Sequence, residues 1–275
     1  MNVLWIFAHP EQRSLNASLR DEGLRELAAA GHPTRVSDLY TMGFDPVLDA
    51  GDFPADPSGD RLRVGAAQER AHRRAELSAD VSAEQEKVRW ASVLVFQFPL
   101  WWFGPPAILK GWFDRVFAQG FAFGVRDERG HRRYGDGGLA GRRALTVTSV
   151  GARASGFGPR GVHGRLDEVL FPLLHGTFWY TGLEALPPYA VYGADRLTDA
   201  GYAEAAAGLR ERIRALPHTE PLPFRTERGG DYDADLVLYP HVAPGRTDLG
   251  AHYTSADDRT APCAASGGAA RNVRR

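Results

Sequence analysis

Residues 93–116 constrain the fold of this chain more than any other segment. The run from Val93 to Phe98 is wholly apolar, which is typical of a parallel strand buried on both faces of a sheet. An aromatic loop, PLWWFG, follows, and Pro105 and Pro106 then predict the first turn of a helix. In open parallel sheets, ligands bind where strands end and helices begin. The rings of this loop therefore predict walls for a flat, aromatic ligand.

Strands and helices alternate along the rest of the first 216 residues. The apolar patterning predicts strands at residues 3–8, 34–39, 93–98, 144–150 and 185–192, with helices at 15–30, 61–76, from 82, from 105, at 166–176 and at 199–216. Gly31 is placed to end the first helix, and Ser82 with Gln85 reads as a capping box. Alternation of this kind predicts an α/β fold with a doubly wound, five-stranded parallel sheet in the order 2-1-3-4-5.

The chain divides into three parts by composition. Residues 1–216 carry the regular pattern and form the predicted catalytic domain. Residues 217–243 are expected to pack as an extension on this domain or on a dimer partner. Residues 244–275 read as a solvated, disordered tail, because they are polar and lack periodicity.

Charge and cysteine content exclude several classes of function. Lys plus Arg (33) and Asp plus Glu (34) nearly cancel, so we expect no attraction to nucleic acid or to an anionic membrane. A single cysteine, Cys263, excludes an internal disulfide and a multi-cysteine metal site. We therefore predict no metal and a reducing, cytoplasmic location. No apolar stretch approaches the roughly 20 residues of a membrane span, and the N-terminus does not resemble a signal peptide.

The loop after the first strand supports two interpretations. His9, Ser14 and Asn16 lie where a helix N-terminus offers free N–H groups to a diphosphate. A capped helix with a surface histidine explains the same residues. The loop has neither G-x-G-x-x-G nor a P-loop, which disfavours a Rossmann site.

Two segments also carry a family resemblance. PLWWFGPPAILKGWFDRVF and AHPEQRSLNASL resemble the NAD(P)H:quinone oxidoreductases of flavodoxin-like fold, a group that includes modulator-of-drug-activity proteins and ancillary proteins of potassium-efflux systems. The likeness covers about residues 2–215. It implies a flavin, with FAD favoured over FMN, NAD(P)H as co-substrate, and a homodimer.

The resemblance also implies which residues bind the cofactor. They lie in the loops after the first, third and fourth strands: His9, Ser14, Leu15, Asn16, Pro99, Leu100, Trp101, Trp102, Phe103, Ser149, Gly151, Ala152 and Phe157. The alternative for the tryptophans is burial in the core, which we expect for Trp112. Asp114 matches a family acid near the flavin, but it also lies four residues from Lys110 and could pair with it.

The predicted catalytic residues are His163, Phe157 and Gly151. His163 matches the family histidine, whereas Phe157 stands where the family has a tyrosine. Phenylalanine cannot donate a proton, so we expect His163 to supply it without a phenolic partner. A histidine that caps the next helix is the alternative.

The substrate pocket departs from the family in the same direction. The residues implied to line it are Trp102, Phe103, Phe123, Val125, Tyr180 and His163. Phe123 and Val125 replace two family tyrosines that close the pocket of the neighbouring subunit, so this pocket should be more apolar. Residues 132–135, RRYG, could contact a 2′-phosphate or serve only solubility.

The favoured function is a flavin-dependent NAD(P)H oxidoreductase that passes hydride by ping-pong to a quinone or quinone-like acceptor. Two alternatives remain at this point. One is a flavin-bound regulatory subunit of a cation-efflux system, and the other is a pathway-specific tailoring reductase.

Overall fold

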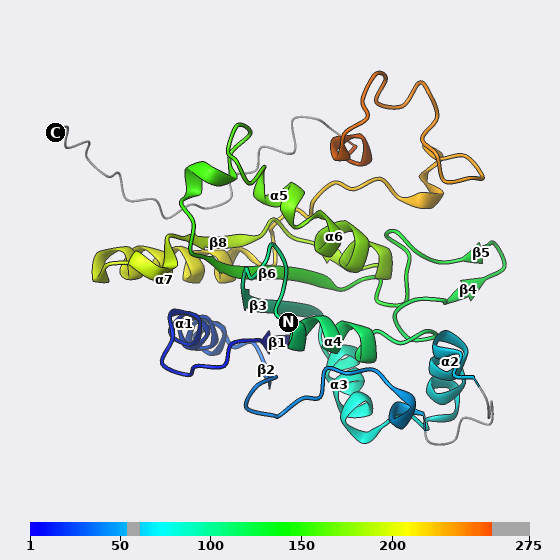
Figure 1. The fold of residues 1–275 in the computed structure, drawn as a ribbon, viewed down its shortest axis with the longest axis horizontal. Coiled ribbons are helices and arrows are strands. Elements are labelled where there is room, and N and C mark those ends of the chain that lie inside the picture. Colours follow the sequence, from blue (N-terminus) through cyan, green and yellow to red (C-terminus); the bar gives the residue numbers. More distant parts are fainter. Residues whose placement is uncertain (54–60, 255–275) are drawn as a thin grey trace.

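A parallel sheet forms the centre of the computed structural model, which describes residues 1–53 and 61–254. Its strands run in the order β2-β1-β3-β6, and β7 and β8 both pair with β6 (Figure 1). The bounds are β1 (Val3–Phe7), β2 (Thr34–Asp38), β3 (Val93–Pro99), β6 (Arg143–Val150), β7 (Glu184–Ala185) and β8 (Tyr189–Tyr192). The predicted fold class and strand order 2-1-3-4-5 are confirmed.

The fifth predicted strand, residues 185–192, is interrupted. β7 pairs with the start of β6 and β8 with its end. Between them lie Pro187 and Pro188, which have no N–H to donate to a ladder. The expectation of one continuous strand was wrong for this reason.

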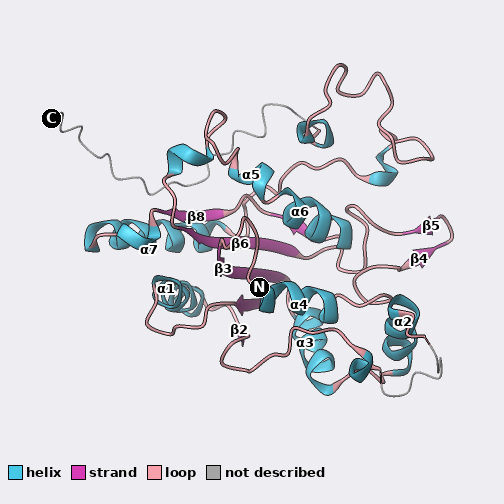
Figure 2. Cartoon of the chain, viewed as in Figure 1, coloured by secondary structure: helices cyan, strands magenta, loops and turns pink. Residues whose placement is uncertain are grey.

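Helices cover both faces of the sheet (Figure 2). α1 (Leu15–Ala29) and α7 (Asp199–Ala215) pack on one face with Trp5 and the other odd residues of β1. α3 (Ala79–Trp90), α4 (Ala107–Val116), α5 (Leu166–Val169) and α6 (Phe171–Leu173) pack on the other with Leu4 and Ile6. Successive strand residues point to opposite faces, so a wholly apolar strand serves two cores at once.

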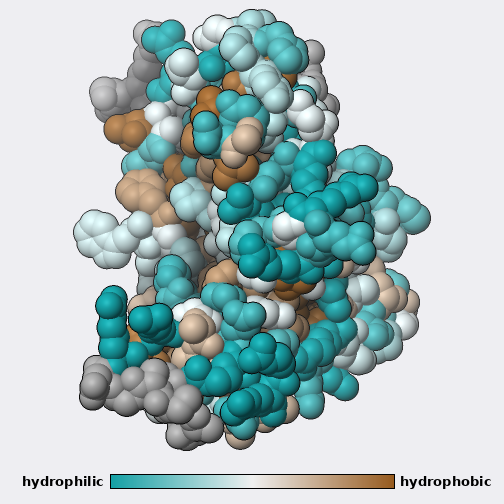
Figure 3. Space-filling model, turned by 90° about the vertical axis from the view of Figure 1, so that its right-hand side faces the viewer, coloured by the Kyte–Doolittle hydropathy of each residue, from teal (hydrophilic) through white to brown (hydrophobic). Residues whose placement is uncertain are grey.

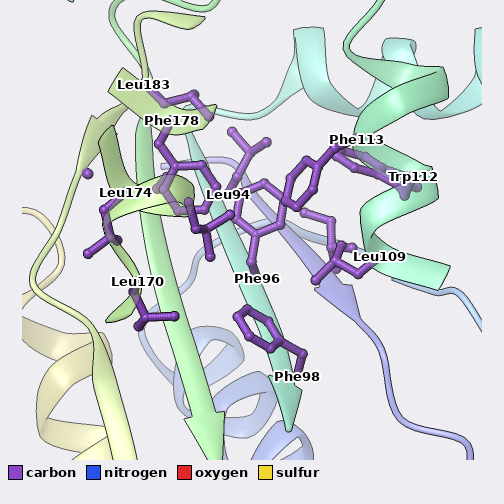
Figure 4. Close-up of a cluster of buried hydrophobic side chains, with 14 of the residues drawn as sticks. Leu94, Phe96, Phe98, Leu109, Trp112, Phe113, Leu170, Leu174, Phe178 and Leu183 are labelled. Atoms are coloured by element: carbon purple, nitrogen blue, oxygen red, sulfur yellow. The ribbon is translucent and has the colours of Figure 1, made fainter. Parts of the chain in front are cut away.

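Aromatic rings fill the core between β3 and the helices (Figure 4). Phe96 stacks on Phe178 with centroids 4.8 Å apart and contacts Phe113 at 5.2 Å. Trp112 is fully buried, as predicted, and its Nε1–H donates to Glu84 at 2.8 Å. This packing holds α4 against β3 and so fixes the aromatic loop that joins them.

Only some of the helix ends lie where the sequence predicted them. α1 ends as predicted, with Gly31 in the left-handed region at φ 71°. The Ser82–Gln85 capping box was wrong, because α3 begins at Ala79. Gln85 is instead buried, and its Nε2 donates to the Val116 carbonyl at the end of α4 (3.0 Å).

Other short elements complete the described chain. α2 (Val64–Arg74) lies in the long excursion between β2 and β3, after a 3-10 turn at Ala50–Asp52. The predicted helix 166–176 is divided into α5, α6 and η3 (Leu174–Trp179), which is π-helical. β4 (Arg126–Asp127) and β5 (Gly130–His131) form a small hairpin that the sequence did not predict.

The C-terminal extension is ordered beyond its predicted end. The Leu222 N–H donates to the Ala185 carbonyl (2.7 Å), and Phe224 pairs with Tyr253 at a ring distance of 4.6 Å. The segment includes η5 (Glu227–Gly229) and η6 (Leu249–His252). The expectation of a disordered tail from residue 244 was therefore wrong for 244–254, and its remainder, 255–275, lies outside the described residues.

Within residues 1–53 and 61–254, no helix is long and apolar enough to cross a bilayer. The same residues contain no group of three or more His, Cys, Asp or Glu side chains placed to hold a metal ion.

Candidate functional site

The carboxyl ends of β1, β3 and β6 open onto one cavity. Parallel strands bring the loops that follow them to the same edge of the sheet. The cavity there has a volume of about 470 Å³, within the range of small-molecule sites. It is lined by His9, Ser14, Leu15, Asn16, Pro99, Leu100, Trp101, Ser149, Gly151, Ala194 and Asp195. The structure thus brings together nine of the residues that the sequence assigned to the cofactor.

Two lining residues, Ala194 and Asp195, escaped the sequence analysis. They lie in η4 (Ala194–Arg196), directly after β8. A Cβ on Gly151 would come within 2.6 Å of the Asp195 Oδ2, so glycine lets this carboxylate approach the backbone. The strand order could have indicated these two residues, because the loop after the fifth parallel strand lies at the same edge of the sheet as the other loops.

The first loop fits both interpretations of its residues at once. Ser14 is the N-cap of α1, and its side chain accepts from the Ala17 N–H at 3.2 Å. It also lines the cavity, as does His9. The Glu11 N–H donates to His9 Nδ1 at 3.1 Å, and burial lowers the pKa of His9 below its usual value. The imidazole is therefore neutral at pH 7.

A buried polar network anchors this loop to the sheet. The Asn16 side-chain amide donates to Ser149 Oγ at 2.9 Å, and Gln97 Nε2 donates to the Asn16 carbonyl at 2.6 Å. Trp5 Nε1–H in turn donates to Gln97 Oε1 at 2.8 Å. Buried networks of this kind fix geometry because each broken bond leaves an unpaired polar group. The start of α1 is held on β3 and β6 in this way.

The aromatic loop presents its rings to solvent. Trp102 is 97% exposed, Phe103 52% and Trp101 44%, so burial in the core was the wrong interpretation for these three. Trp102 and Phe103 have left-handed φ values of 49° and 60°, which are costly for bulky residues. Strain of this kind concentrates at functional sites.

Asp114 forms the ion pair with Lys110 that the sequence offered as its alternative role. Lys110 Nζ donates to both Asp114 carboxylate oxygens, at 2.6 and 2.8 Å, from one turn earlier on α4. The carboxylate is therefore engaged in a surface ion pair.

The fourth loop places His163 in an aromatic group. Its ring lies 4.8 Å from Phe157 and 5.5 Å from Phe103, so three predicted site residues from two loops meet. Ala152 is nearby in the loop, where its carbonyl accepts from the Gly193 N–H at 2.9 Å. Helix capping by His163 was the wrong alternative, since Arg165 occupies the N-cap of α5.

Phe123 and Tyr180 form a separate group with Tyr134, and Val125 lies two residues beyond Phe123 with its carbonyl accepting from the Arg132 N–H at 2.9 Å. Phe123 lies 6.5 Å from Tyr180, and Tyr180 meets Tyr134 edge-on at 5.2 Å. Among the ring contacts of the described residues, none joins this group to Trp102, Phe103 or His163. A single chain therefore does not assemble the whole predicted substrate pocket.

The basic loop at 132–135 is not free to bind a 2′-phosphate in this arrangement. Arg132 pairs with Asp136 at 3.1 Å, and Arg133 pairs with Glu227 at 2.5 Å. The Arg132–Asp136 pair is local, whereas the Arg133–Glu227 pair joins this loop to the C-terminal extension.

Comparison with known proteins places this geometry in a family. Residues 1–213 match the family described as flavodoxin-like fold. The chain belongs to that family. A ribosyldihydronicotinamide dehydrogenase-like protein, traD, of Penicillium crustosum is 43% identical over 84% of this chain and 87% of its own. The human ribosyldihydronicotinamide dehydrogenase [quinone] is 35% identical over 80% of this chain and 94% of its own.

A solved structure gives the same result. A putative quinone reductase from Klebsiella pneumoniae superposes with a TM-score of 0.89 and 45% identity, covering 92% of this chain and 99% of its own. The resemblance to NAD(P)H:quinone oxidoreductases is thereby confirmed, and the chain is a quinone-reductase-like flavoprotein of the flavodoxin-like family.

Proposed function

We propose that this chain is an FAD-dependent NAD(P)H oxidoreductase that reduces a quinone or quinone-like acceptor in two-electron steps. One observation carries the proposal: a cavity at the carboxyl ends of β1, β3 and β6 is lined by Trp101, which begins an aromatic loop where Trp102 and Phe103 have left-handed φ values and Phe103 contacts His163. The relatives named quinone reductases and dehydrogenases support it. One cleft that serves both donor and acceptor gives ping-pong kinetics.

The residues present suit a flavin dinucleotide. The N-terminus of α1 offers N–H groups and a positive dipole end for a diphosphate, beside the cavity residues Ser14 and Asn16. The Asp195 carboxylate can accept hydrogen bonds from ribose hydroxyls, a role acidic residues take in other dinucleotide sites. At Gly151 the backbone stays accessible to a flavin, because glycine has no side chain to cover it. We favour FAD over FMN because the histidine-bearing first loop and the chain length resemble FAD-using members.

The chain's own groups would orient the reactants and move a proton. FAD, when bound, supplies the ring that accepts hydride from NAD(P)H and delivers it to the acceptor. Trp102 and Phe103 would cover the cleft and exclude water. His163, between Phe157 and Phe103, is placed to give a proton to an acceptor oxygen on which charge develops.

We also propose a homodimer. Trp102 and Val162 are 97% and 90% exposed in the single chain, an apolar area that calls for a cover. Phe123 and Val125 of a second copy would close the cleft, as the family resemblance implies, and Tyr180 would come with them because it lies beside Phe123. The predicted cytoplasmic location and the absence of nucleic-acid binding remain predictions.

The decisive experiment begins with the colour of the purified protein. A yellow sample, release of FAD identified by mass, and repeated turnover of NADH or NADPH with menadione would support the proposal. FMN in place of FAD would correct the cofactor alone. A colourless protein that takes up no added flavin would overturn the proposal.

The same assay separates the alternatives. An enzyme oxidises many equivalents of NAD(P)H per flavin, whereas a regulatory subunit oxidises about one. A relative named as an ancillary protein of a potassium-efflux system is 36% identical, over only 42% of this chain. A tailoring reductase would turn over slowly with menadione and rapidly with its own acceptor.

A further inference from the structure

The loop between β6 and α5 carries an excess of positive charge. Residues 151–165 include Arg153, Arg160 and Arg165 and no acidic residue. Arg165 is offset by Asp167, to which its Nε donates at 3.0 Å. Arg153 and Arg160 are both exposed, and among the described residues neither guanidinium group has an ion-pair or hydrogen-bonding partner. Two cations of this loop are therefore available to an anion.

Charged surface alone does not distinguish this loop. On the side of the molecule shown in Figure 3, hydrophilic side chains cover most of the middle and lower part. The β4–β5 hairpin lies on that side (Figure 1), where Arg228 of the extension pairs with Asp127 at 2.7 Å. α2 also carries exposed arginines, such as Arg73. What distinguishes Arg153 and Arg160 is their position beside His163.

The fold of the loop brings both arginines to this histidine. The Gly156 N–H donates to the Arg153 carbonyl, and the His163 N–H donates to the Gly156 carbonyl, both at 3.0 Å. A Cβ on Gly156 would stand 2.8 Å from Cδ2 of the His163 ring. Gly161, directly after Arg160, packs on the same turn, where an added Cβ would collide with the Gly156 carbonyl oxygen. Both arginines therefore leave the chain within one compact turn next to the imidazole.

The same imidazole belongs to the proposed acceptor cleft. Its ring lies 5.5 Å from Phe103 and 4.8 Å from Phe157. Val162, between Arg160 and His163 in the sequence, is 90% exposed. A ligand at this place meets flat apolar surface together with unpaired guanidinium groups. A planar ring that carries an acid group suits both.

One carboxylate lies near the start of the loop. Asp195 approaches the backbone at Gly151, and the neighbouring Arg196 donates from Nη2 to the Gly151 carbonyl at 3.2 Å. Arg153 follows Gly151 by two residues, so this carboxylate offsets part of its field, whereas Arg160 is nine residues along the loop. Arg160 is accordingly the main anion-binding residue and Arg153 the second.

We propose that the acceptor is anionic: a quinone or quinone-like ring whose sulfonate, carboxylate or phosphate group binds Arg160 and Arg153. The inference rests on the proposed function, because it names the substrate class of the same cleft. The acceptor gains a hydride that comes from NAD(P)H and a proton, and it leaves as the hydroquinone with its acid group unchanged. Guanidinium groups bind such groups through paired N–H donors, and exposed positive charge also attracts them from solution.

The phosphates of NAD(P)H are the other anions that reach this cleft. In ping-pong kinetics the donor and the acceptor react in separate steps, so kcat/KM for one contains no contribution from the other. The two sources are therefore distinguished by which kcat/KM a substitution at Arg160 lowers. We expect the loss in kcat/KM for the acceptor.

The test compares menadione with 1,4-naphthoquinone-2-sulfonate, which carries a sulfonate in place of the methyl group. In Arg160→Gln, the ratio of kcat/KM for the sulfonate to that for menadione should fall about fivefold, and further when Arg153→Gln is added. Arg160→Lys keeps the charge but not the paired donors, so it should lose less. Arg73→Gln removes one exposed charge from α2 and is the matched control, in which the ratio should stay as in the native chain.

Naphthalene-2-sulfonate separates this inference from the proposed function, because it binds as an anion but accepts no hydride. Calorimetric titration of the full chain should show saturable binding that weakens about fivefold in Arg160→Gln. A colourless protein that still binds it through Arg160 would overturn the proposed function and support the anion site. An unchanged acceptor ratio in Arg160→Gln, or a loss confined to kcat/KM for NADPH, would overturn the inference and leave the proposed function in place.

Discussion

The imidazole ring of His163 packs against the phenyl ring of Phe157 with their centroids 4.8 Å apart. Phe157 comes from the 3-10 turn η2 (Ala154–Phe157) that follows β6, and it is 8% exposed. A phenyl ring can hold the imidazole in place but cannot donate a hydrogen bond. If the proposed function is right, the proton for the acceptor comes from His163 without a phenol beside it.

The substitution Phe157→Tyr should therefore raise activity on simple quinones. Positioned general acids contribute about 10²–10⁴ to a rate, and a hydroxyl added to an existing site should recover about tenfold in kcat/KM for menadione. Steady-state assays at equal flavin content measure the effect, and the KM for NAD(P)H serves as the internal control. An unchanged rate would mean that position 157 does not face the reacting groups.

Gly151→Ala should weaken flavin binding. The new Cβ would stand 2.6 Å from Asp195 Oδ2, which forces the carboxylate out of its place in the cavity. We expect the flavin dissociation constant to rise about tenfold, equivalent to about 1.4 kcal/mol.

Gly158→Ala is the matched control for this substitution. It lies in the same loop, and its nearest neighbour would be the Ser155 carbonyl at 3.7 Å, an ordinary contact. Fluorescence titration of the apoprotein with flavin measures both variants. Equal affinities would argue against a flavin at this edge of the sheet.

Much of the site could be predicted because its signals are local. The apolar run of β3, the rings after it and the prolines before α4 are contiguous in the sequence, and they fix one loop completely. Strand order then follows from alternation, and it brings the loops after β1, β3 and β6 to one edge. For Ser14 the helix-cap and cofactor-site interpretations are compatible, because its side chain caps α1 and also lines the cavity.

What the sequence could not predict depends on contacts between distant residues. Asp195 belongs to the site only because β8 ends beside Gly151. Gln85 looked like a capping residue, but its side chain bonds to Val116, 31 residues away. The polar segment 244–254 is ordered through Tyr253, which pairs with Phe224. No local sequence pattern around these residues indicates such contacts with distant residues.

Asp52→Asn should destabilise the fold strongly. Arg115 of α4 donates from Nε and Nη2 to the Asp52 carboxylate, with both side chains 6% exposed. Asp80 is a second partner at 2.6 Å. Loss of one charge leaves the buried guanidinium only partly compensated, at a cost of about 3 kcal/mol.

Lys110→Met on the same helix is the comparison. Its ion pair with Asp114 is exposed on both sides, and such pairs contribute roughly 0–1 kcal/mol. Urea unfolding at pH 7 gives both free energies of unfolding. A similar loss in the two variants would contradict the view that the Arg115 network holds the excursion between β2 and β3 in place.

Acid should destabilise the interface between the domain and the C-terminal extension. Burial lowers the pKa of His175 to about 4, from 6.5, and that of the neighbouring His252 is lowered as well, first by burial and then by Arg225. A histidine with a depressed pKa is held neutral in the folded chain. The unfolded chain therefore binds more protons between pH 6.5 and pH 4, so stability rises with pH across this window and is lost as the pH falls.

For His175 alone, this linkage amounts to about 2 kcal/mol at pH 5 relative to pH 7.5. Phenylalanine at position 175 cannot titrate and preserves the stacking on Phe171. The free energy of unfolding should thus fall by about 2 kcal/mol less in His175→Phe than in the native chain over that range. Carboxylates that titrate in the same window contribute equally to both proteins and cancel in the difference. Urea unfolding at the two pH values provides the measurement, and identical pH dependence in the two proteins would show that His175 stays hydrated in the folded state.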